Sequence, residues 1–359
     1  MAQEIISQLL RARVARLRRH LPSGPLDRPR EIAYDTYRLG GRLLRRLRII
    51  LRSNGCRIPT CTMCHLPNLT VPRNEGIVRI ADYVQQISEA IDAATPVDAI
   101  AVYNDGSFFS DAELPPEARE YVYAAAERLG VYCLMVESLP SFVTESSITS
   151  AISRLRHVKL AVAMGLQSSD LDVRRLCIMT PVEEAEFVRA RKLLQSLSVL
   201  AKVYLLLKPA FLTEDEAISD CVRSICWLEP QGIDDISICP ARVESGTLLE
   251  DLFDKRLYVP PRFRALIQVL QTLGGIRKSV RMSLVNTVFS STTRAVADGC
   301  HACRALMSSA LLAFNDGSED NLGHIGDCAV CKEYAEHFLP SEYRVLSLQE
   351  RITRYLESI

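Results

Sequence analysis

At residues 54–64 the chain reads NGCRIPTCTMC, so Cys56, Cys61 and Cys64 share one short loop with the spacing C-x4-C-x2-C. The preceding run, residues 46–53, is rich in leucine and isoleucine and predicts a buried strand that ends at the loop. Three thiolates that converge from one loop suit a soft metal centre. The stretch therefore predicts a metal-binding loop delivered by a strand.

The number of cysteine ligands distinguishes between possible metal centres. Three cysteines leave one iron of a [4Fe–4S] cluster without a protein ligand, and a substrate or cofactor can bind there. A structural zinc site needs a fourth ligand. His65 directly follows Cys64 and is too close in sequence to complete a tetrahedron comfortably. The spacing favours an open, reactive cluster, with a zinc knuckle and unliganded core cysteines as the alternatives.

The loop resembles the cluster-binding loop of the radical S-adenosylmethionine (SAM) enzymes, with Met63 in the apolar or aromatic slot before the last cysteine. Its x4 spacing is similar to that of two branches, the radical subunit of archaeosine synthase and the elongator catalytic subunit. The resemblance implies that the open iron binds the amine and carboxylate of SAM. It also implies a reducing partner such as flavodoxin or ferredoxin, whose electron cleaves SAM to methionine and a 5′-deoxyadenosyl radical.

Length and composition limit the size of the fold, the kind of partner and the cellular compartment. The chain has 359 residues, enough for one barrel-sized α/β domain with a small appendage, and 48% of them are apolar. With 43 basic and 43 acidic residues the formal net charge is zero, which argues against a strongly basic nucleic-acid binder but allows a local patch for tRNA. The 12 cysteines, several in C-x2-C pairs, predict metal binding in a reducing cytoplasm. No apolar run is long enough for a membrane span and no signal core is present, so we expect a cytosolic protein without a membrane partner.

Apolar periodicity predicts alternating strands and helices. The expected strands are 46–53, 98–104, 130–137, 158–165, 200–208, 234–239 and 278–285. The expected helices between them are 76–93, 115–129, 144–156, 182–197, 214–229 and 260–273. Such alternation means a parallel sheet with crossover helices. We therefore predict a partial (β/α)6 TIM-like barrel over residues 45–285, an N-terminal helix and lead-in over 1–44, and a cysteine-rich extension over 286–359.

The N-terminal 22 residues carry apolar side chains at helical spacing and five arginines elsewhere around the helix. The favoured interpretation is a cap on the main domain with a solvated basic face. The alternative is a phosphate-contacting arm for tRNA or another anionic partner. Residues 22–44, broken by prolines and a glycine, are expected to be a linker and lead-in.

The chemistry of a parallel barrel lies at the carboxyl ends of its strands. Stretches similar to the radical subunit family occur there over residues 45–275, and the resemblance implies SAM contacts. The candidate cofactor-binding residues are Gly106, Ser107, Glu137, Gln167, Ser169, Lys208 and Met63. Glu137 and Lys208 are also the candidate catalytic residues. The Glu137 carboxylate at a strand end can accept hydrogen bonds from ribose hydroxyls or the methionyl amine, or else serves as a helix cap or salt-bridge partner. The buried Lys208, which ends an apolar strand, requires an anionic partner. That partner is either a SAM or substrate group or a structural ion pair.

A second cysteine group lies near the C-terminus. Cys300, Cys303, Cys328 and Cys331 form two C-x2-C pairs that can close a four-thiolate site. A zinc ion that folds the extension is favoured, and an auxiliary iron–sulfur cluster and free thiols are the alternatives. The remaining cysteines, Cys133, Cys177, Cys221, Cys226 and Cys239, are expected to be small buried hydrophobic residues.

The sequence leaves the substrate open. The resemblance to archaeosine synthase implies carbon–nitrogen cleavage of a lysine-derived adduct of a deazaguanine base in tRNA. The run Cys61-Thr62-Met63-Cys64-His65 differs from the glycines usual in that family, which favours a small amino-acid-like or specialised-metabolite substrate, with tRNA modification second. A rival of another class is a zinc-binding interaction protein that uses both cysteine groups structurally.

Overall fold

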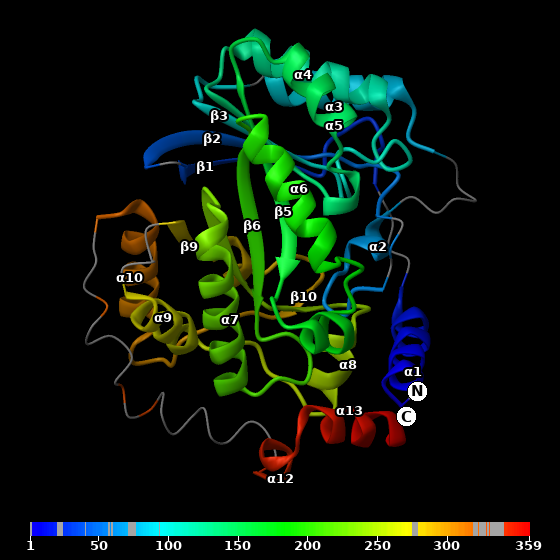
Figure 1. Cartoon of the computed structure of the whole chain (residues 1–359), viewed down its shortest axis with the longest axis vertical. Coiled ribbons are helices and arrows are strands. Elements are labelled where there is room, and N and C mark those ends of the chain that lie inside the picture. Colours follow the sequence, from blue (N-terminus) through cyan, green and yellow to red (C-terminus); the bar gives the residue numbers. More distant parts are fainter. Residues whose placement is uncertain are drawn as a thin grey trace.

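The computed structural model describes residues 2–19, 24–39, 41–56, 58, 60–70, 77–92, 94–274, 279–318, 322, 328, 330 and 341–359. Its centre is an eight-stranded sheet with the order β1-β2-β3-β4-β5-β6-β7-β9. The strands are β1 Glu31–Leu39, β2 Arg42–Ile50, β3 Ala99–Tyr103, β4 Cys133–Glu137, β5 Lys159–Gln167, β6 Leu200–Leu207, β7 Asp235–Pro240 and β9 Val280–Met282. From β2 to β9 each neighbouring pair is parallel. The curled sheet confirms the predicted partial barrel (Figure 1).

The crossover helices lie where the sequence predicts them and cover one face of the sheet (Figure 1). They are α3 Ile80–Asp92, α4 Pro116–Leu129, α5 Glu145–Arg154, α6 Glu184–Ser196, α7 Glu214–Leu228 and α9 Phe263–Thr272. Local signals set their ends: Thr213 and Glu216 form a capping box at the start of α7, and Gly130 takes a left-handed conformation after α4. These caps satisfy backbone groups that a helix end leaves unpaired.

Shorter and terminal elements complete the structure around the barrel. The helices are α1 Ala2–Leu17, α2 Leu66–Leu69, α8 Leu248–Asp254, α10 Arg304–Asp316, α12 Ser341–Val345 and α13 Leu348–Glu357, with a π-helix η2 at Val173–Ile178. Three short 3-10 helices are η1 Pro140–Phe142, η3 Glu229–Gln231 and η5 Leu284–Thr287. The strands β8 Val243–Glu244 and β10 Thr293–Ala295 pair in a separate two-stranded sheet.

Strand β1 corrects the prediction of a linker between residues 22 and 44. It pairs antiparallel with β2 from Glu31 opposite Ile50 to Leu39 opposite Arg42. Tyr37 and Leu39 are buried and pack with Leu44 and small residues at the start of β3, β4 and β5. The hairpin therefore fills the inner face of the sheet near the amino ends of its strands, a contact that crossover periodicity does not indicate.

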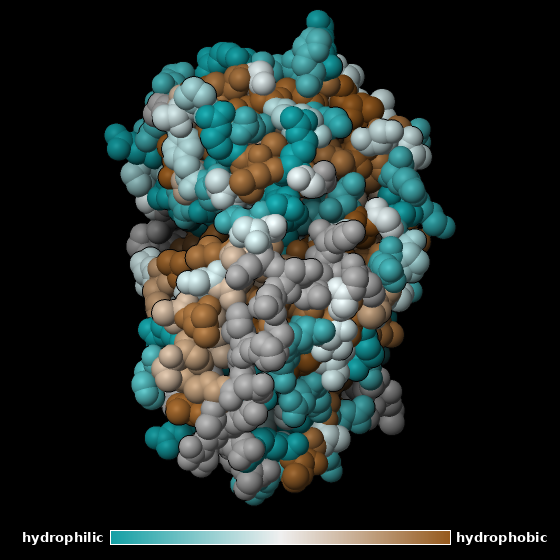
Figure 2. Space-filling model, turned by 90° about the vertical axis from the view of Figure 1, so that its left-hand side faces the viewer, coloured by the Kyte–Doolittle hydropathy of each residue, from teal (hydrophilic) through white to brown (hydrophobic). Residues whose placement is uncertain are grey.

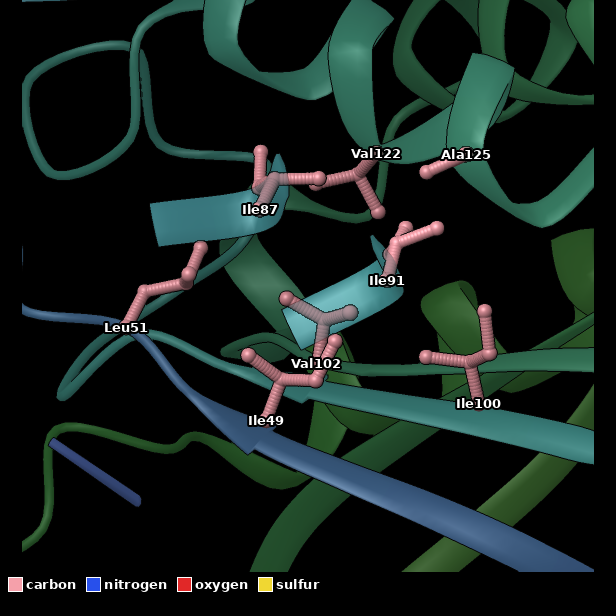
Figure 3. A pocket seen from close by; sticks show the side chains of 8 residues that line it. All are labelled: Ile49, Leu51, Ile87, Ile91, Ile100, Val102, Val122 and Ala125. Carbon is pink, nitrogen blue, oxygen red and sulfur yellow. The ribbon is translucent and has the colours of Figure 1, made fainter. Parts of the chain in front are cut away.

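The main apolar core lies on the other face, between the sheet and its helices. A pocket in this layer is lined entirely by apolar side chains from β2, β3, α3 and α4, or adjoining them (Figure 3). They are Ile49, Leu51, Ile87, Ile91, Ile100, Val102, Val122 and Ala125. Without a polar group to orient a ligand, it belongs to the packing of the sheet against its helices.

The N-terminal helix packs against the body as the favoured interpretation predicts. Leu10 and Val14 are buried, and Arg13 donates a 2.8 Å hydrogen bond to Asp251 of α8. Ile5 and Leu9, expected on the apolar face, are instead about half exposed, at 52% and 50%. Across the part of the chain that the structure describes, no helix has the length and apolarity needed to cross a membrane.

Candidate functional site

The three-cysteine loop follows β2 and is held against the π-helix η2 by its own threonines. The Thr62 hydroxyl donates a 2.6 Å hydrogen bond to the carbonyl of Cys177, and the Thr62 N–H donates one of 2.9 Å to the carbonyl of Ile178. Thr60 donates to the carbonyl of Met179 at 2.9 Å. These carbonyls lie at the end of a helix, where they lack helical partners. Thr60, between the first two cysteines, and Thr62, between the last two, thus hold the loop backbone in place by hydrogen bonds to the protein alone.

Arg18 reaches the same loop from the end of α1. Its guanidinium donates a 2.8 Å hydrogen bond to the carbonyl of Cys61 and a second, short one to the carbonyl of Cys64. Burial lowers the pKa of Arg18, and the nearby thiols act in the opposite direction. Sequence analysis missed this residue because the arginines of α1 look alike in a helical pattern, and only the packing of α1 selects one.

The turn after β3 packs directly on the first cysteine. The Cys56 N–H donates a 2.9 Å hydrogen bond to the carbonyl of Asp105. A Cβ on Gly106 would lie 3.2 Å from the nitrogen of Cys56 and 2.4 Å from Glu113 Oε2, so a side chain there would displace Glu113 and crowd the cysteine loop. Burial raises the pKa of Asp105 to about 6, and Arg30, which donates to it at 3.0 Å, opposes that shift. The backbone at Gly106 thus lies close to the cysteine loop and Glu113, and its contact with SAM stays a prediction.

Three residues at the ends of parallel strands have left-handed backbones although none is glycine: Asp105 after β3, Gln167 in β5 and Lys208 after β6 have φ of 55°, 70° and 64°. Such conformations cost energy and cluster at functional sites. The three residues lie at the carboxyl ends of the strands, where the sequence predicts the site. Two of the three are residues that the sequence analysis selected.

The predicted site residues have the following surroundings. Glu137 ends β4 on the inner face, where burial raises its pKa and Tyr204 hydrogen bonds to it. Lys208 is 2% exposed and forms a 3.0 Å ion pair with Glu214. Of the two partners that the sequence allowed for this lysine, the structural ion pair is therefore present. The Gln167 amide lies against Gly165, where a Cβ would come within 2.5 Å of it.

Ser107, Ser169 and Met63 make contacts within the protein. Ser107 Oγ accepts a 3.1 Å hydrogen bond from the Leu139 N–H, which ties the ends of β3 and β4 together. Ser169 accepts one of 3.2 Å from Ser224 of α7. Met63 is half-buried and packs against the main core. Their roles toward SAM stay predictions.

The inner face also carries charged residues that the sequence analysis did not select. Lys202 of β6 forms a 3.4 Å ion pair with Asp235 of β7, which accepts a 2.9 Å hydrogen bond from Arg281 of β9. The Tyr37 hydroxyl donates to Asp235 and accepts from Lys202. Burial lowers the pKa of Lys202 despite its acidic partner. Period-two alternation along β6 was the available signal, since it places Lys202 and Tyr204 on one face.

The chemistry of the loop fits an iron–sulfur cluster with bound SAM. Burial raises the pKa of Cys56 to about 12 and also raises those of Cys61 and Cys64, so cationic metal is needed to keep them as thiolates. Close by, the Asn104 side chain is buried with neither amide atom hydrogen-bonded within the described part of the chain, and the same holds for Ser138 Oγ. Buried polar groups of this kind normally have a partner, and a polar ligand at the strand ends would supply one.

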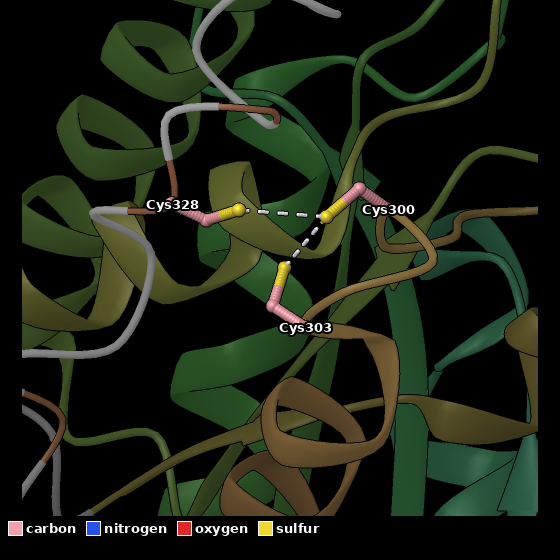
Figure 4. A group of neighbouring side chains, drawn as sticks. All are labelled: Cys300, Cys303 and Cys328. Carbon is pink, nitrogen blue, oxygen red and sulfur yellow. Dashed lines mark hydrogen bonds between the residues drawn. The ribbon is translucent and has the colours of Figure 1, made fainter.

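The C-terminal group has a different geometry. The sulfur atoms of Cys300, Cys303 and Cys328 point toward one another (Figure 4), at 3.2 Å between the first two and 3.6 Å between Cys300 and Cys328. They form the one set of three or more candidate metal ligands within 4.8 Å among the described residues. The predicted fourth ligand, Cys331, lies outside the described residues. Cys226, predicted to be buried, is exposed on α7.

Comparison with known proteins places the chain among its relatives. No protein-family model matches it. Archaeosine synthase subunit beta of Methanosarcina acetivorans is 29% identical over 324 residues, which span 89% of this chain and 92% of that protein. The protein of the same name from Thermococcus kodakarensis is 31% identical over 227 residues, 62% of this chain and 70% of that one. The chain belongs to the archaeosine synthase subunit beta family.

Two solved structures show weaker similarity to this chain. Elp3 of Methanocaldococcus infernus superposes with a TM-score of 0.47 at 18% identity, over 67% of this chain and 59% of that one. Queuine lyase from Clostridium spiroforme, bound to SAM and queuine, gives 0.41 at 16% identity over 58% and 79%. The resemblance to archaeosine synthase that the sequence indicated is confirmed by the two subunit beta proteins. As a member of the archaeosine synthase subunit beta family, the chain is an enzyme.

Proposed function

We propose that this protein is a radical SAM enzyme in which Cys56, Cys61 and Cys64 hold a [4Fe–4S] cluster. The observation that carries the proposal is a half-buried three-thiol loop, held at the carboxyl ends of a half-barrel, whose three sulfurs are too far apart to share one ion. When bound, such a cluster would pass an electron from a reductant such as flavodoxin or ferredoxin to SAM, which would be cleaved to methionine and a 5′-deoxyadenosyl radical. The role of the chain is to position SAM and one substrate C–H bond and to exclude water.

The strand-end residues are proposed to hold SAM. Asn104 and Ser138 have buried polar atoms that find no partner among the residues the structure describes, and these atoms suit the amine, carboxylate or ribose hydroxyls of SAM. Gly106 keeps the backbone next to Cys56 free of a side chain. Glu137, Gln167 and Lys208 line the same edge, and Lys208 contacts an anionic group of the ligand only if its pair with Glu214 rearranges.

The substrate is proposed to present an amino-acid moiety to the barrel interior. Glu137, at the carboxyl end of β4 on the inner face, offers a buried carboxyl group to the ammonium group of such a moiety. The relatives named archaeosine synthase subunit beta favour a tRNA carrier for that moiety, that is, cleavage of a carbon–nitrogen bond in a lysine adduct of a deazaguanine nucleoside, a lyase-type reaction. We therefore propose tRNA modification ahead of a small free substrate, the reverse of the order that the sequence favoured.

The test is an anaerobic assay of the reconstituted protein with dithionite and SAM. Wild type is expected to form 5′-deoxyadenosine, Cys61→Ala to lose it, and Cys226→Ser, which changes an exposed thiol, to keep it. No nucleoside from wild type, together with a protein that contains only zinc, would support the zinc-binding interaction protein instead.

The carrier is tested in the same assay with two substrates. The lysine–deazaguanine adduct is supplied within tRNA and as the free modified nucleoside. Turnover of the tRNA alone supports the tRNA reaction, and equal turnover of both supports the small-substrate alternative. Formation of 5′-deoxyadenosine with neither product would reject this substrate class while leaving the SAM reaction in place.

A further inference from the structure

The C-terminal cysteine group lies next to a helix that crosses the open side of the half-barrel. Cys303 immediately precedes α10, and α10 contacts both edge strands of the sheet, β1 and β9, as well as α9. We propose that Cys300, Cys303 and Cys328 bind a single zinc ion and that this ion fixes α10 as the closure of the barrel. This site is separate from the proposed SAM site and does not depend on it.

The sulfur spacing selects one ion rather than a cluster. Zinc–thiolate bonds of about 2.3 Å in a tetrahedron place ligand sulfurs about 3.8 Å apart. The distances from Cys300 Sγ to its two neighbours are 3.2 and 3.6 Å, and all three sulfurs lie within 4.8 Å. In an iron–sulfur cluster at most two cysteines share one iron, so a third cysteine would lie farther away than the observed spacing. Clustered thiolates in a tetrahedral arrangement are the ligands that zinc prefers.

The backbone around the first pair is folded tightly for this purpose. The carbonyl of Cys300 accepts hydrogen bonds from the N–H groups of Cys303 at 3.2 Å and of Arg304 at 2.9 Å, which brings both thiols to one side of the turn. A Cβ on Gly299 would come within 2.9 Å of the Cα of Arg304, so the turn requires glycine. The preceding Asp298 accepts a 2.9 Å bond from the Phe263 N–H at the start of α9. The turn is thereby anchored to the barrel before α10 begins.

The other end of α10 is attached to the edge strand β9. The Asn315 side chain accepts a 2.9 Å hydrogen bond from the Met282 N–H and donates one of 2.8 Å to the Met282 carbonyl. One amide thus satisfies both backbone groups that a neighbouring strand would pair. The carbonyl of Asn315 accepts a 3.1 Å bond from Arg281, whose Nε donates to Asp235 on the inner face. The helix end is therefore connected to the charged residues inside the barrel.

The same end of α10 also reaches the opposite edge of the sheet. Arg38 of β1 donates a hydrogen bond to the carbonyl of Asp316. Figure 1 shows α10 beside α9 and β9, and Figure 2 looks onto this side of the molecule, where hydrophobic and hydrophilic residues are mixed. One end of α10 therefore lies beside the metal ligands, and its other end lies between the edge strands β1 and β9 and bonds to both.

The proposal is tested on the full-length, anaerobically reconstituted protein by metal analysis, zinc absorption spectroscopy and hydrogen exchange. Wild type is expected to contain one zinc per chain in addition to its iron, with a zinc–sulfur distance near 2.3 Å. Cys303→Ser should lose the zinc, keep the iron of the N-terminal loop, and show several-fold faster amide exchange in β9 and α10. The control, Cys226→Ser, removes an exposed thiol of α7 and should match wild type in all three measurements.

Four outcomes would overturn the proposal. Iron in place of zinc at this group would indicate an auxiliary cluster, and a disulfide between Cys300 and Cys303 in a zinc-free wild type would remove the ligands. Zinc retained by Cys303→Ser would place the ion elsewhere. Loss of zinc with unchanged exchange in β9 and α10 would reject the closure role. If Cys303→Ser is insoluble, chelation of zinc from folded wild type, followed by zinc addition, gives the same exchange comparison.

Discussion

The loop that carries Cys56, Cys61 and Cys64 and the segment that carries Cys300, Cys303 and Cys328 present the same ligand in different surroundings. In the first, Thr60, Thr62 and Arg18 hold the loop backbone through protein hydrogen bonds, and the sulfurs are spread. In the second, the sulfurs converge and Cys328 belongs to a different chain segment from the first pair. The first loop is thus arranged before metal binds, whereas the second group needs an ion to join its segments.

Metal removal should give the largest difference between the two cysteine groups, measured as the loss in the free energy of unfolding. Stripping zinc from the C-terminal group should lower the free energy of unfolding by about 4 kcal/mol relative to protein in free zinc a thousandfold above its dissociation constant. Cys61→Ala should remove SAM cleavage yet lower that free energy by less than about 1 kcal/mol, because the threonines still hold the loop. Urea denaturation measures both values. Equal losses would contradict the idea that only the first loop is arranged in advance.

Thr62→Val tests how the first loop is held. The substitution keeps the shape of a fully buried side chain but leaves the Cys177 carbonyl without its donor. We expect a loss of roughly 1–3 kcal/mol in stability and lower iron retention after desalting. The matched control is Thr272→Val on α9, whose exposed hydroxyl also bonds to a helix carbonyl, at 2.8 Å. A control that costs as much as Thr62→Val would show that burial of the loop contact is unimportant.

Asn315→Ala tests the closure helix independently of its metal. Two hydrogen bonds to Met282 are lost, so stability should fall by about 1–2 kcal/mol while zinc content stays unchanged. Asn315→Asp keeps the acceptor for the Met282 N–H and should lie between alanine and wild type. Zinc loss in Asn315→Ala would show that the helix end and the metal group are more tightly coupled than the contacts indicate.

Arg18→Gln should have the smallest effect, on the cluster rather than on the fold. A positive charge beside the loop favours the reduced, more negative cluster, so its removal should lower the reduction potential by tens of millivolts. Redox titration followed by electron paramagnetic resonance measures this potential. Arg11→Gln, which changes an exposed arginine of the same helix, serves as the control. Equal potentials in Arg18→Gln and wild type would limit Arg18 to a structural contact.

Much of the barrel was predictable because its signals are local. Strands β2 to β7, strand β9 and six helices follow from apolar periodicity, and helix ends follow from caps such as Thr213. The ligands Cys56, Cys61 and Cys64 follow from spacing within one loop. Strand β1 was missed since its partner is the antiparallel β2 and its buried Tyr37 and Leu39 lie inside the sheet, where no crossover pattern applies.

Site residues contributed from distant segments were not predictable in the same way. Arg18 is chosen among similar arginines only by the packing of α1, and Lys202 meets Asp235 and Arg281 only because β6, β7 and β9 are neighbours. Cys226 lies in an apolar helix, yet its position around α7 exposes it. A pattern of residue types along the chain does not contain these distances.

By itself the amino-acid sequence determined the alternating α/β architecture, the three-cysteine loop at a strand end and the paired cysteines near the C-terminus, because each depends on spacing over a few residues. Tertiary structure alone decided which cations face the loop and the barrel interior, which strand fills the inner face, and that Cys300, Cys303 and Cys328 converge beside a helix joining both sheet edges. These contacts depend on how segments far apart in sequence pack, and that is set by the free energy of the whole fold.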